Sequence, residues 1–135
     1  MAAFSQWYET TILNYVRGTA IATTPSALEI RLHTANPLDD YSGAAEVGGG
    51  LGYVKQAIVL GVPGSVVGTG STSTNTGNII FGPATGAWGS ITHWSIHGSA
   101  GDLNFYFFGA FLAAKAVIAG DGYTIPNGTL SILVR

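Results

Sequence analysis

The sequence predicts a mainly β protein, an antiparallel β-sandwich or jelly roll that carries one short N-terminal α-helix. After residue 26, apolar and polar residues alternate in short segments, which Gly, Pro and Asn turn signals separate at about 8–12-residue spacing. Apolar residues recur with the helical period only within residues 4–17. A chain of 135 residues can bury one core, so we predict a single domain over 1–135, with the helix at 4–17 and the β region at 27–134.

The predicted helix over residues 4–17 has an unusually aromatic face. Ser5 can cap its first turn, and Gly18 follows its last residue, as is typical of a helix C-terminus. A helix so short and so aromatic is expected to dock on another surface. The residues on its single apolar stripe are Phe4, Trp7, Tyr8, Ile12, Tyr15 and Val16.

The β region begins with a clear half-buried strand at 27–34, where Leu28, Ile30 and Leu32 alternate with polar residues. Residues 36–52 and the Gly, Ser and Thr tract at 61–77 are predicted as loops, with a short edge strand around Val66 as the alternative for the second. The Asn127-Gly128 pair is typical of a β-hairpin turn. The remaining predicted strands are 53–60, 78–81, 90–97, 104–112, 115–118, 123–125 and 129–134.

The segment 104–112 is apolar on both of its strand faces. Alternation places Phe105, Phe107 and Phe111 on one face, and it places Tyr106, Phe108 and Leu112 on the other. A sandwich strand needs only one apolar face, so the second face requires a cover. Either the N-terminal helix or a neighbouring subunit can supply that cover, and both can do so together.

Charged residues make up only 9% of the chain, with 5 Lys and Arg and 7 Asp and Glu. So few scattered cations cannot neutralise a phosphate backbone, which argues against nucleic acid as a partner. The chain has no cysteine, which rules out disulfides and thiolate zinc sites. The N-terminal residues do not predict a signal peptide, and the longest apolar stretch, about ten residues, is too short to cross a membrane.

The sequence contains no recognisable catalytic motif, so we expect no enzymatic activity, no cofactor and no metal. His93 and His97 have the spacing of two metal ligands on a helix, but on a strand they lie about 13 Å apart. His33 is expected on a solvated strand face beside Glu29 and Arg31. A calcium site built from Asp39, Asp40 and Glu46 is weighed against a solvated acidic loop, and the loop is favoured.

Several short motifs resemble one known family. YVRGT at 15–19 follows the predicted helix, and LEIRLHTANP at 28–37 and GYVKQ at 52–56 follow it in turn. FGPAT at 81–85 then leads to WGSITH at 88–93. In these motifs, which are spread over most of the chain, the sequence resembles the small bacteriophage virion proteins commonly labelled tail-fibre protein.

The resemblance implies a non-enzymatic β-sandwich of the phage virion, acting as a tail or fibre component or as a capsid decoration (cement) protein. We expect it to pack against copies of itself, with a trimer favoured, and against other virion proteins. The alternative is a carbohydrate-binding, host-recognition module that contacts a host glycan through Trp88 and Trp94. The residues expected at the assembly interface are Phe4, Trp7, Tyr8, Tyr15, Phe105, Phe107 and Phe111.

Overall fold

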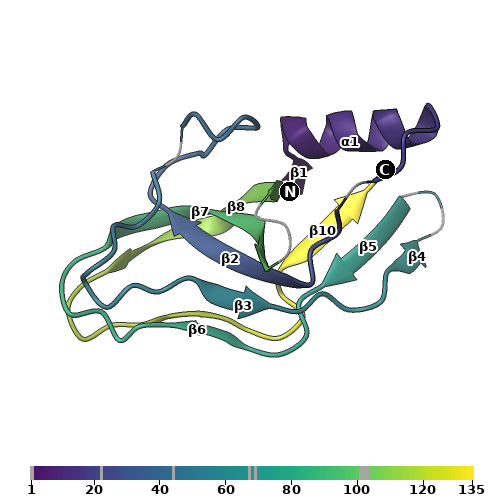
Figure 1. The fold of residues 1–135 in the computed structure, drawn as a ribbon. Helices are drawn as coiled ribbons and strands as arrows, with labels where there is room; N and C mark the ends of the chain where they lie inside the picture. Colours follow the sequence, from purple (N-terminus) through teal and green to yellow (C-terminus); the bar gives the residue numbers. More distant parts are fainter. Residues whose placement is uncertain (1, 22, 44, 67, 69, 101–103) are drawn as a thin grey trace.

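The fold is built from ten β-strands and one α-helix within the part of the chain that the structure describes. A computed structural model (Figure 1) describes residues 2–21, 23–43, 45–66, 68, 70–100 and 104–135. The elements are β1 (Ala2–Phe4), α1 (Gln6–Val16), β2 (Ala27–His33), β3 (Gln56–Ile58), β4 (Gly64–Val66), β5 (Gly70–Thr74), β6 (Ile79–Phe81), β7 (Gly89–Ala100), β8 (Phe105–Val117), β9 (Tyr123–Ile125) and β10 (Ser131–Val134).

The strands form three antiparallel sheets, and the predicted mainly β, sandwich-like architecture is confirmed. The largest sheet has the order β1-β8-β7-β2-β3, and the two smaller ones have the orders β10-β5-β4 and β6-β9. One cluster of buried side chains fills the space between the large sheet and the smaller sheets. It is made mostly of aromatic and β-branched residues, among them Ile30, Leu32, Phe81, Ile91, Trp94, Ile96, Tyr123, Ile125 and Ile132.

The helix starts two residues later than the sequence predicts. Ser5 has an extended backbone, and its hydroxyl accepts a hydrogen bond from the Tyr8 amide, which makes it the N-cap as expected. Phe4 belongs to β1, where it pairs with Phe107, and not to the helix. Gly18 has a φ of +93°, a conformation open to glycine, and it ends the helix as the sequence predicts.

Three of the strand predictions need correction. The predicted strand 115–118 is the end of β8, which runs without a break from Phe105. The Asn127-Gly128 turn forms no hairpin, because β9 pairs with β6 while β10 pairs with β5. The tract at 61–77 contains β4, as the alternative predicts, and also β5, which was predicted as loop.

Two irregularities in the β7–β8 pairing set the directions of the β8 side chains. The register shifts between Ile96 and His97, so simple alternation fails there. Phe105 and Phe108 therefore lie together, with ring centroids 5.7 Å apart, while Phe107 contacts the N-terminal aromatic residues. The expectation that Phe105 and Phe107 share a face is wrong for this reason.

The second irregularity is larger and gives β8 an excursion. Ile91 pairs with Lys115 and His93 pairs with Ala110, so Thr92 alone stands opposite the segment 111–114. Four residues facing one is an extended bulge, which projects the middle of β8 away from the regular ladder.

Candidate functional site

Aromatic side chains attach the first turn of α1 to β8. Tyr8 makes edge-on contacts with Tyr106 and Phe107, at centroid distances of 5.2 and 5.4 Å. Trp7 contacts Tyr106 at 5.3 Å, and Phe4 contacts Phe107 at 5.6 Å. Edge-on aromatic pairs of this kind stabilise by about 0.5–1.5 kcal/mol each beyond the area they bury. The first turn is therefore firmly held, and four of the predicted interface residues take part in holding it.

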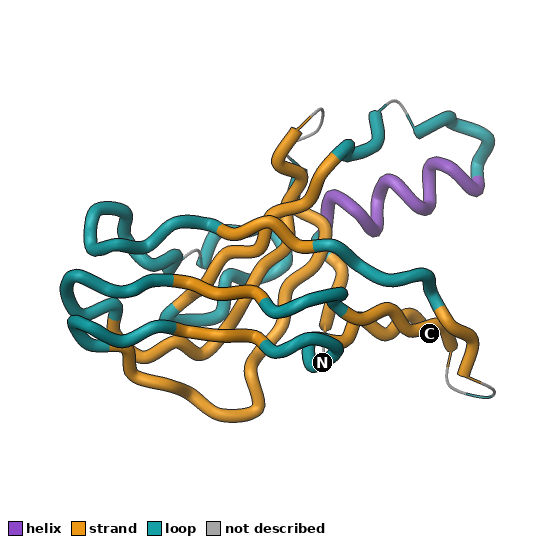
Figure 2. Tube along the Cα trace, turned by 90° about the horizontal axis from the view of Figure 1, so that it is seen from below, coloured by secondary structure: helices purple, strands orange, loops and turns teal. Residues whose placement is uncertain are grey.

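The rest of α1 has no such attachment. No residue of the helix is buried, and Leu13, Tyr15 and Val16 are 66%, 61% and 77% exposed. Figure 2 shows the helix extending past the strands to which its first turn is joined. An isolated helix of this length is marginal in water, so an apolar half left in solvent is an unusual feature.

The β8 excursion, residues 111–114, carries a second exposed apolar group. Leu112 at its tip is as exposed as in an extended peptide, at 111% of the reference area. Phe111 turns the other way and packs on Tyr123 with centroids 5.1 Å apart. Next to the tip lies a cavity of about 460 Å³, lined largely by apolar residues of β8, β9 and the start of β10.

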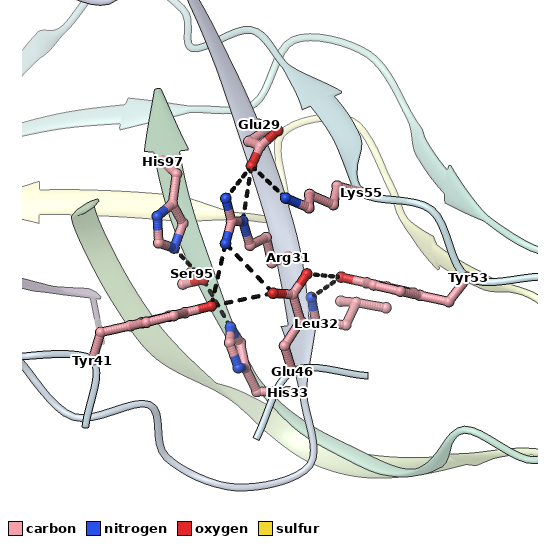
Figure 3. Close-up of polar contacts among 10 residues, drawn as sticks. All are labelled: Glu29, Arg31, Leu32, His33, Tyr41, Glu46, Tyr53, Lys55, Ser95 and His97. Carbon is pink, nitrogen blue, oxygen red and sulfur yellow. Dashed lines mark hydrogen bonds and ion pairs between the residues drawn. The ribbon is translucent and has the colours of Figure 1, made fainter. Parts of the chain in front are cut away.

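A polar network covers the outer face of the large sheet (Figure 3). Arg31 on β2 donates from Nε to Oε1 of Glu29 at 2.8 Å, and its Nη1 lies 3.5 Å from both Glu46 and Tyr41. Burial alone would lower the pKa of Arg31, but the hydrogen bonds to Glu29 and Tyr41 raise it above its ordinary value. Lys55 adds a more exposed contact, 3.5 Å from Glu29. The guanidinium therefore keeps its positive charge, and the carboxylates of Glu29 and Glu46 balance that charge.

Tyr53 connects this network to the backbone of β2. Its hydroxyl donates to Glu46 at 3.2 Å and accepts from the Leu32 amide at 3.0 Å. Burial raises the pKa of Tyr53 well above its ordinary value, so the hydroxyl keeps its proton. Glu46 also accepts from the Tyr41 hydroxyl at 3.3 Å, so two tyrosines and one arginine hold its carboxylate.

His33 and His97 share one hydroxyl beneath the network. Oγ of Ser95 lies 2.8 Å from Nε2 of His33 and 3.0 Å from Nε2 of His97, and all three residues are buried. Burial, with the nearby Arg31 charge, lowers the pKa of His33 to about 4 and that of His97 to about 3. Both rings are neutral near pH 7.

The expectation of a solvated His33 is therefore wrong, because Tyr41 and Glu46, which follow β2, lie over this strand face. Tyr41 on the loop after β2 packs edge-on against His33 at 5.7 Å and against His97 at 5.0 Å. The polar residues Glu29, Arg31 and His33, which alternate with apolar ones, identify this strand face in the sequence. No sequence pattern indicates that Tyr41 covers it.

A cleft of about 670 Å³ opens above Arg31 and His97. Its walls come from the start of α1 and from the 39–41 part of the loop, which lie on the same side of the large sheet in Figure 1. The lining mixes three aromatic residues with polar ones: Gln6, Trp7, Thr10, Arg31, Asp39, Asp40, Tyr41, His97, Asn104 and Phe105.

The other residues singled out in the sequence are more scattered. Trp88 and Trp94 are 5% and 4% exposed in the core, and the Trp88 indole donates to the Leu51 carbonyl, so neither supports a sugar-stacking platform. Asp39 and Asp40 are exposed while Glu46 points into the network. Among the described residues, no group of three or more His, Cys, Asp or Glu is placed to hold a metal ion. No helix in that part of the chain is long and apolar enough to span a membrane.

The comparisons with known proteins agree with the resemblance seen in the motifs. No curated protein matches the sequence. One family model, described as podophage GP4 fiber I protein gp80, matches residues 3–133. That match includes the helix, strands of every sheet, and both the free half of α1 and the β8 excursion. The chain therefore belongs to this family of phage fibre proteins.

Proposed function

We propose that this protein is a self-associating, non-enzymatic structural component of a phage virion, with the free half of α1 as its principal assembly surface. The observation that carries the proposal is the exposure of Leu13, Tyr15 and Val16 on a helix that has no buried residue. Burying such side chains against a neighbour contributes about 25 cal/mol per Å². It also stabilises a helix too short to be stable alone.

The matched family is described as a fibre protein, which favours a place in the tail over a role as capsid cement. A closed ring of copies, with a trimer favoured, would bury the free half of α1 on each copy. Low surface charge suits this role, because few ions must lose water when copies pack. Leu112 on the β8 excursion offers a second apolar contact.

Ser95 with His33 and His97 has the residue types of a nucleophile and a base. Ser95 is fully buried, however, and it does not line the cleft. A substrate therefore has no route to its hydroxyl, which supports a structural role for this arrangement and a non-enzymatic protein.

Sedimentation velocity on the purified chain tests the proposal. We expect a discrete oligomer that dissociates when Leu13 and Tyr15 are both replaced by Ser. The control is Val62→Ser, which removes a still more exposed apolar side chain outside the helix and should leave the oligomer intact. A chain that stays monomeric at high concentration and is absent from purified particles would disprove the proposal.

A further inference from the structure

The cleft above Arg31 is held open by fixed contacts between its walls. The Gln6 amide donates to the Asp39 carbonyl at 2.9 Å, which ties the start of α1 to the opposite loop. The Asp40 carboxylate accepts from the Ser42 amide at 2.9 Å, which fixes the turn that carries it. Since these bonds lie within the protein, the cleft is preformed and does not depend on a ligand for its shape.

Rigid aromatic surfaces make up much of the cleft. Phe105 stacks on His97 with centroids 4.9 Å apart and a 20° interplanar angle, and Tyr41 packs against both rings. Trp7 lies on the opposite wall and is 36% exposed, unlike the two core tryptophans. These rings give a bound molecule an apolar face to lie on, at little cost in side-chain entropy.

The charges in the cleft disfavour an anion. The one cation in the lining, Arg31, is already engaged by Glu29 and Glu46, and His97 is neutral. Asp39 and Asp40 stand at the rim without an ion-pair partner among the described residues. A phosphate or carboxylate would meet net negative charge, while the buried guanidinium opposes a cation at the floor.

A neutral polyol with one apolar face fits all of these features. A pyranose has C–H groups on one face that pack against an aromatic ring. Its hydroxyls match the acceptors of Asp39 and Asp40 and the donors and acceptors of Gln6 and Thr10. The volume, about 670 Å³, lies within the range of about 300–1,000 Å³ that is usual for small-molecule sites.

We propose that this cleft binds a neutral saccharide, with a pyranose ring against Trp7 and Tyr41 and its hydroxyls hydrogen-bonded to Asp39 and Asp40. The site lies within one copy of the chain, so it is independent of the assembly surface and works in a monomer as well as in an oligomer. It also differs from the Trp88 and Trp94 platform considered from the sequence, which is buried.

Saturation-transfer NMR on the full chain tests this site, with the methyl glycosides of glucose, galactose and mannose as neutral probes, N-acetylneuraminic acid as an anion and choline as a cation. An array of neutral and acidic glycans extends the panel. We expect at least one neutral glycan to bind, and we expect the two ionic probes not to bind. Binding should also change the fluorescence of Trp7, the exposed indole.

Two variants locate the binding in the cleft. Asp40→Asn keeps the acceptor that bonds Ser42 and removes the charge, and Trp7→Ala removes the aromatic wall; each should weaken binding by about tenfold or more, a loss of about 1.4 kcal/mol. Trp7→Phe should retain binding without the fluorescence change. Glu9→Gln is the matched control, because Glu9 is an exposed residue of the same helix that lies outside the cleft lining.

Three results would overturn the assignment. One is the absence of binding to any neutral glycan at millimolar concentration. Another is binding that survives both Asp40→Asn and Trp7→Ala in folded protein, as judged by circular dichroism. The third is preferential binding of the acid or of choline, which would make the cleft a site for ions.

Discussion

Nε2 of His33 lies 2.8 Å from Oγ of Ser95, across the β2–β7 pair and beneath the ring of Tyr41. Strand pairing sets this contact, because His33 and Ser95 sit on neighbouring strands and face the same side of the sheet. Burial under the loop after β2, together with the nearby Arg31 charge, disfavours the protonated form of the His33 imidazole and lowers its pKa.

Stability is expected to depend on pH through His33 and His97. Their folded pKa values of about 4 and 3 lie below the ordinary 6.5. Below pH 6.5 the unfolded chain therefore binds protons at these histidines more readily than the folded chain does. The free energy of unfolding should therefore be highest above pH 6.5 and fall as the pH drops from 6.5 toward 4. Urea unfolding at a series of pH values measures this slope.

Histidine variants distinguish the contribution of the buried histidines to this pH dependence from that of the carboxylates. Replacing His33 and His97 by Gln should flatten the slope between pH 6.5 and 4, whatever the cost in stability at pH 7. His93→Gln should change it less, because His93 is the more exposed ring. A slope that is equal in all of these proteins would contradict the assignment.

Removing the charge of Arg31 is expected to destabilise the protein. Arg31→Met keeps an unbranched apolar stem but leaves Glu46 without its cation and Glu29 with only the exposed Lys55, at a cost of about 2–3 kcal/mol. Lys55→Met, which removes the exposed member of the same network, should cost less than about 1 kcal/mol. Chemical denaturation of both variants measures the difference, and equal losses would mean that burial of the network contributes little.

Much of the fold could be predicted from the sequence. The strand at 27–34 and the capping role of Ser5 were predicted nearly to the residue, since period-two alternation and capping chemistry are local. β5 was missed because its Ser and Thr residues carry no hydrophobic alternation. The two register shifts of β8 were also missed, because pairing between strands decides them.

The candidate sites were less predictable than the fold. Trp7 and Tyr8 were recognised from their aromatic spacing, but their contact with Tyr106 depends on how β1 and β8 pair. No local sequence pattern links the segments that the cleft brings together, which contribute Gln6, Trp7, Thr10, Arg31, residues 39–41, His97, Asn104 and Phe105. Tertiary folding alone creates that surface.

Ser5 is expected to contribute more than an ordinary helix cap. Its hydroxyl accepts from the Tyr8 amide and donates to the Phe105 carbonyl, and the residue is fully buried. Ser5→Ala should lower the free energy of unfolding by about 2 kcal/mol, because it removes the helix cap and the hydroxyl that donates to the Phe105 carbonyl. Ser26→Ala, at an exposed serine that also bonds a carbonyl, should cost less than about 0.5 kcal/mol in the same denaturation assay.

Asn75 is expected to be sensitive to a single change of chemical group. Its Nδ2 donates to the carbonyls of Gly77 and Pro126, and its Oδ1 accepts from the Leu130 amide. Asn75→Asp places an acceptor against two carbonyls and should cost about 3 kcal/mol in thermal or urea unfolding. Asn127→Asp is the comparison, because Asn127 accepts from the Gly77 amide at an exposed site and should lose far less. Similar losses in both would contradict this account.

Phe111 and Leu112 are neighbours, but substitutions at the two positions are expected to change stability by very different amounts. Phe111→Ala removes packing against Tyr123 and the core and should cost about 2–3 kcal/mol. Leu112→Ser should leave the free energy of unfolding within about 0.5 kcal/mol in the monomer, because the side chain is fully exposed. Melting temperatures of the two variants give the answer, and a large loss on Leu112→Ser would show that the tip is packed.

The β8 excursion also determines where this fold can change its length. Inserting one residue elsewhere in a strand exchanges inward and outward side chains along everything that follows. Residues 111–114 already stand opposite Thr92 alone, and regular pairing continues on both sides of them. Residues gained or lost at this tip leave the alternation of β8 intact, so the tip is the natural insertion point for a tag, a probe or a foreign peptide.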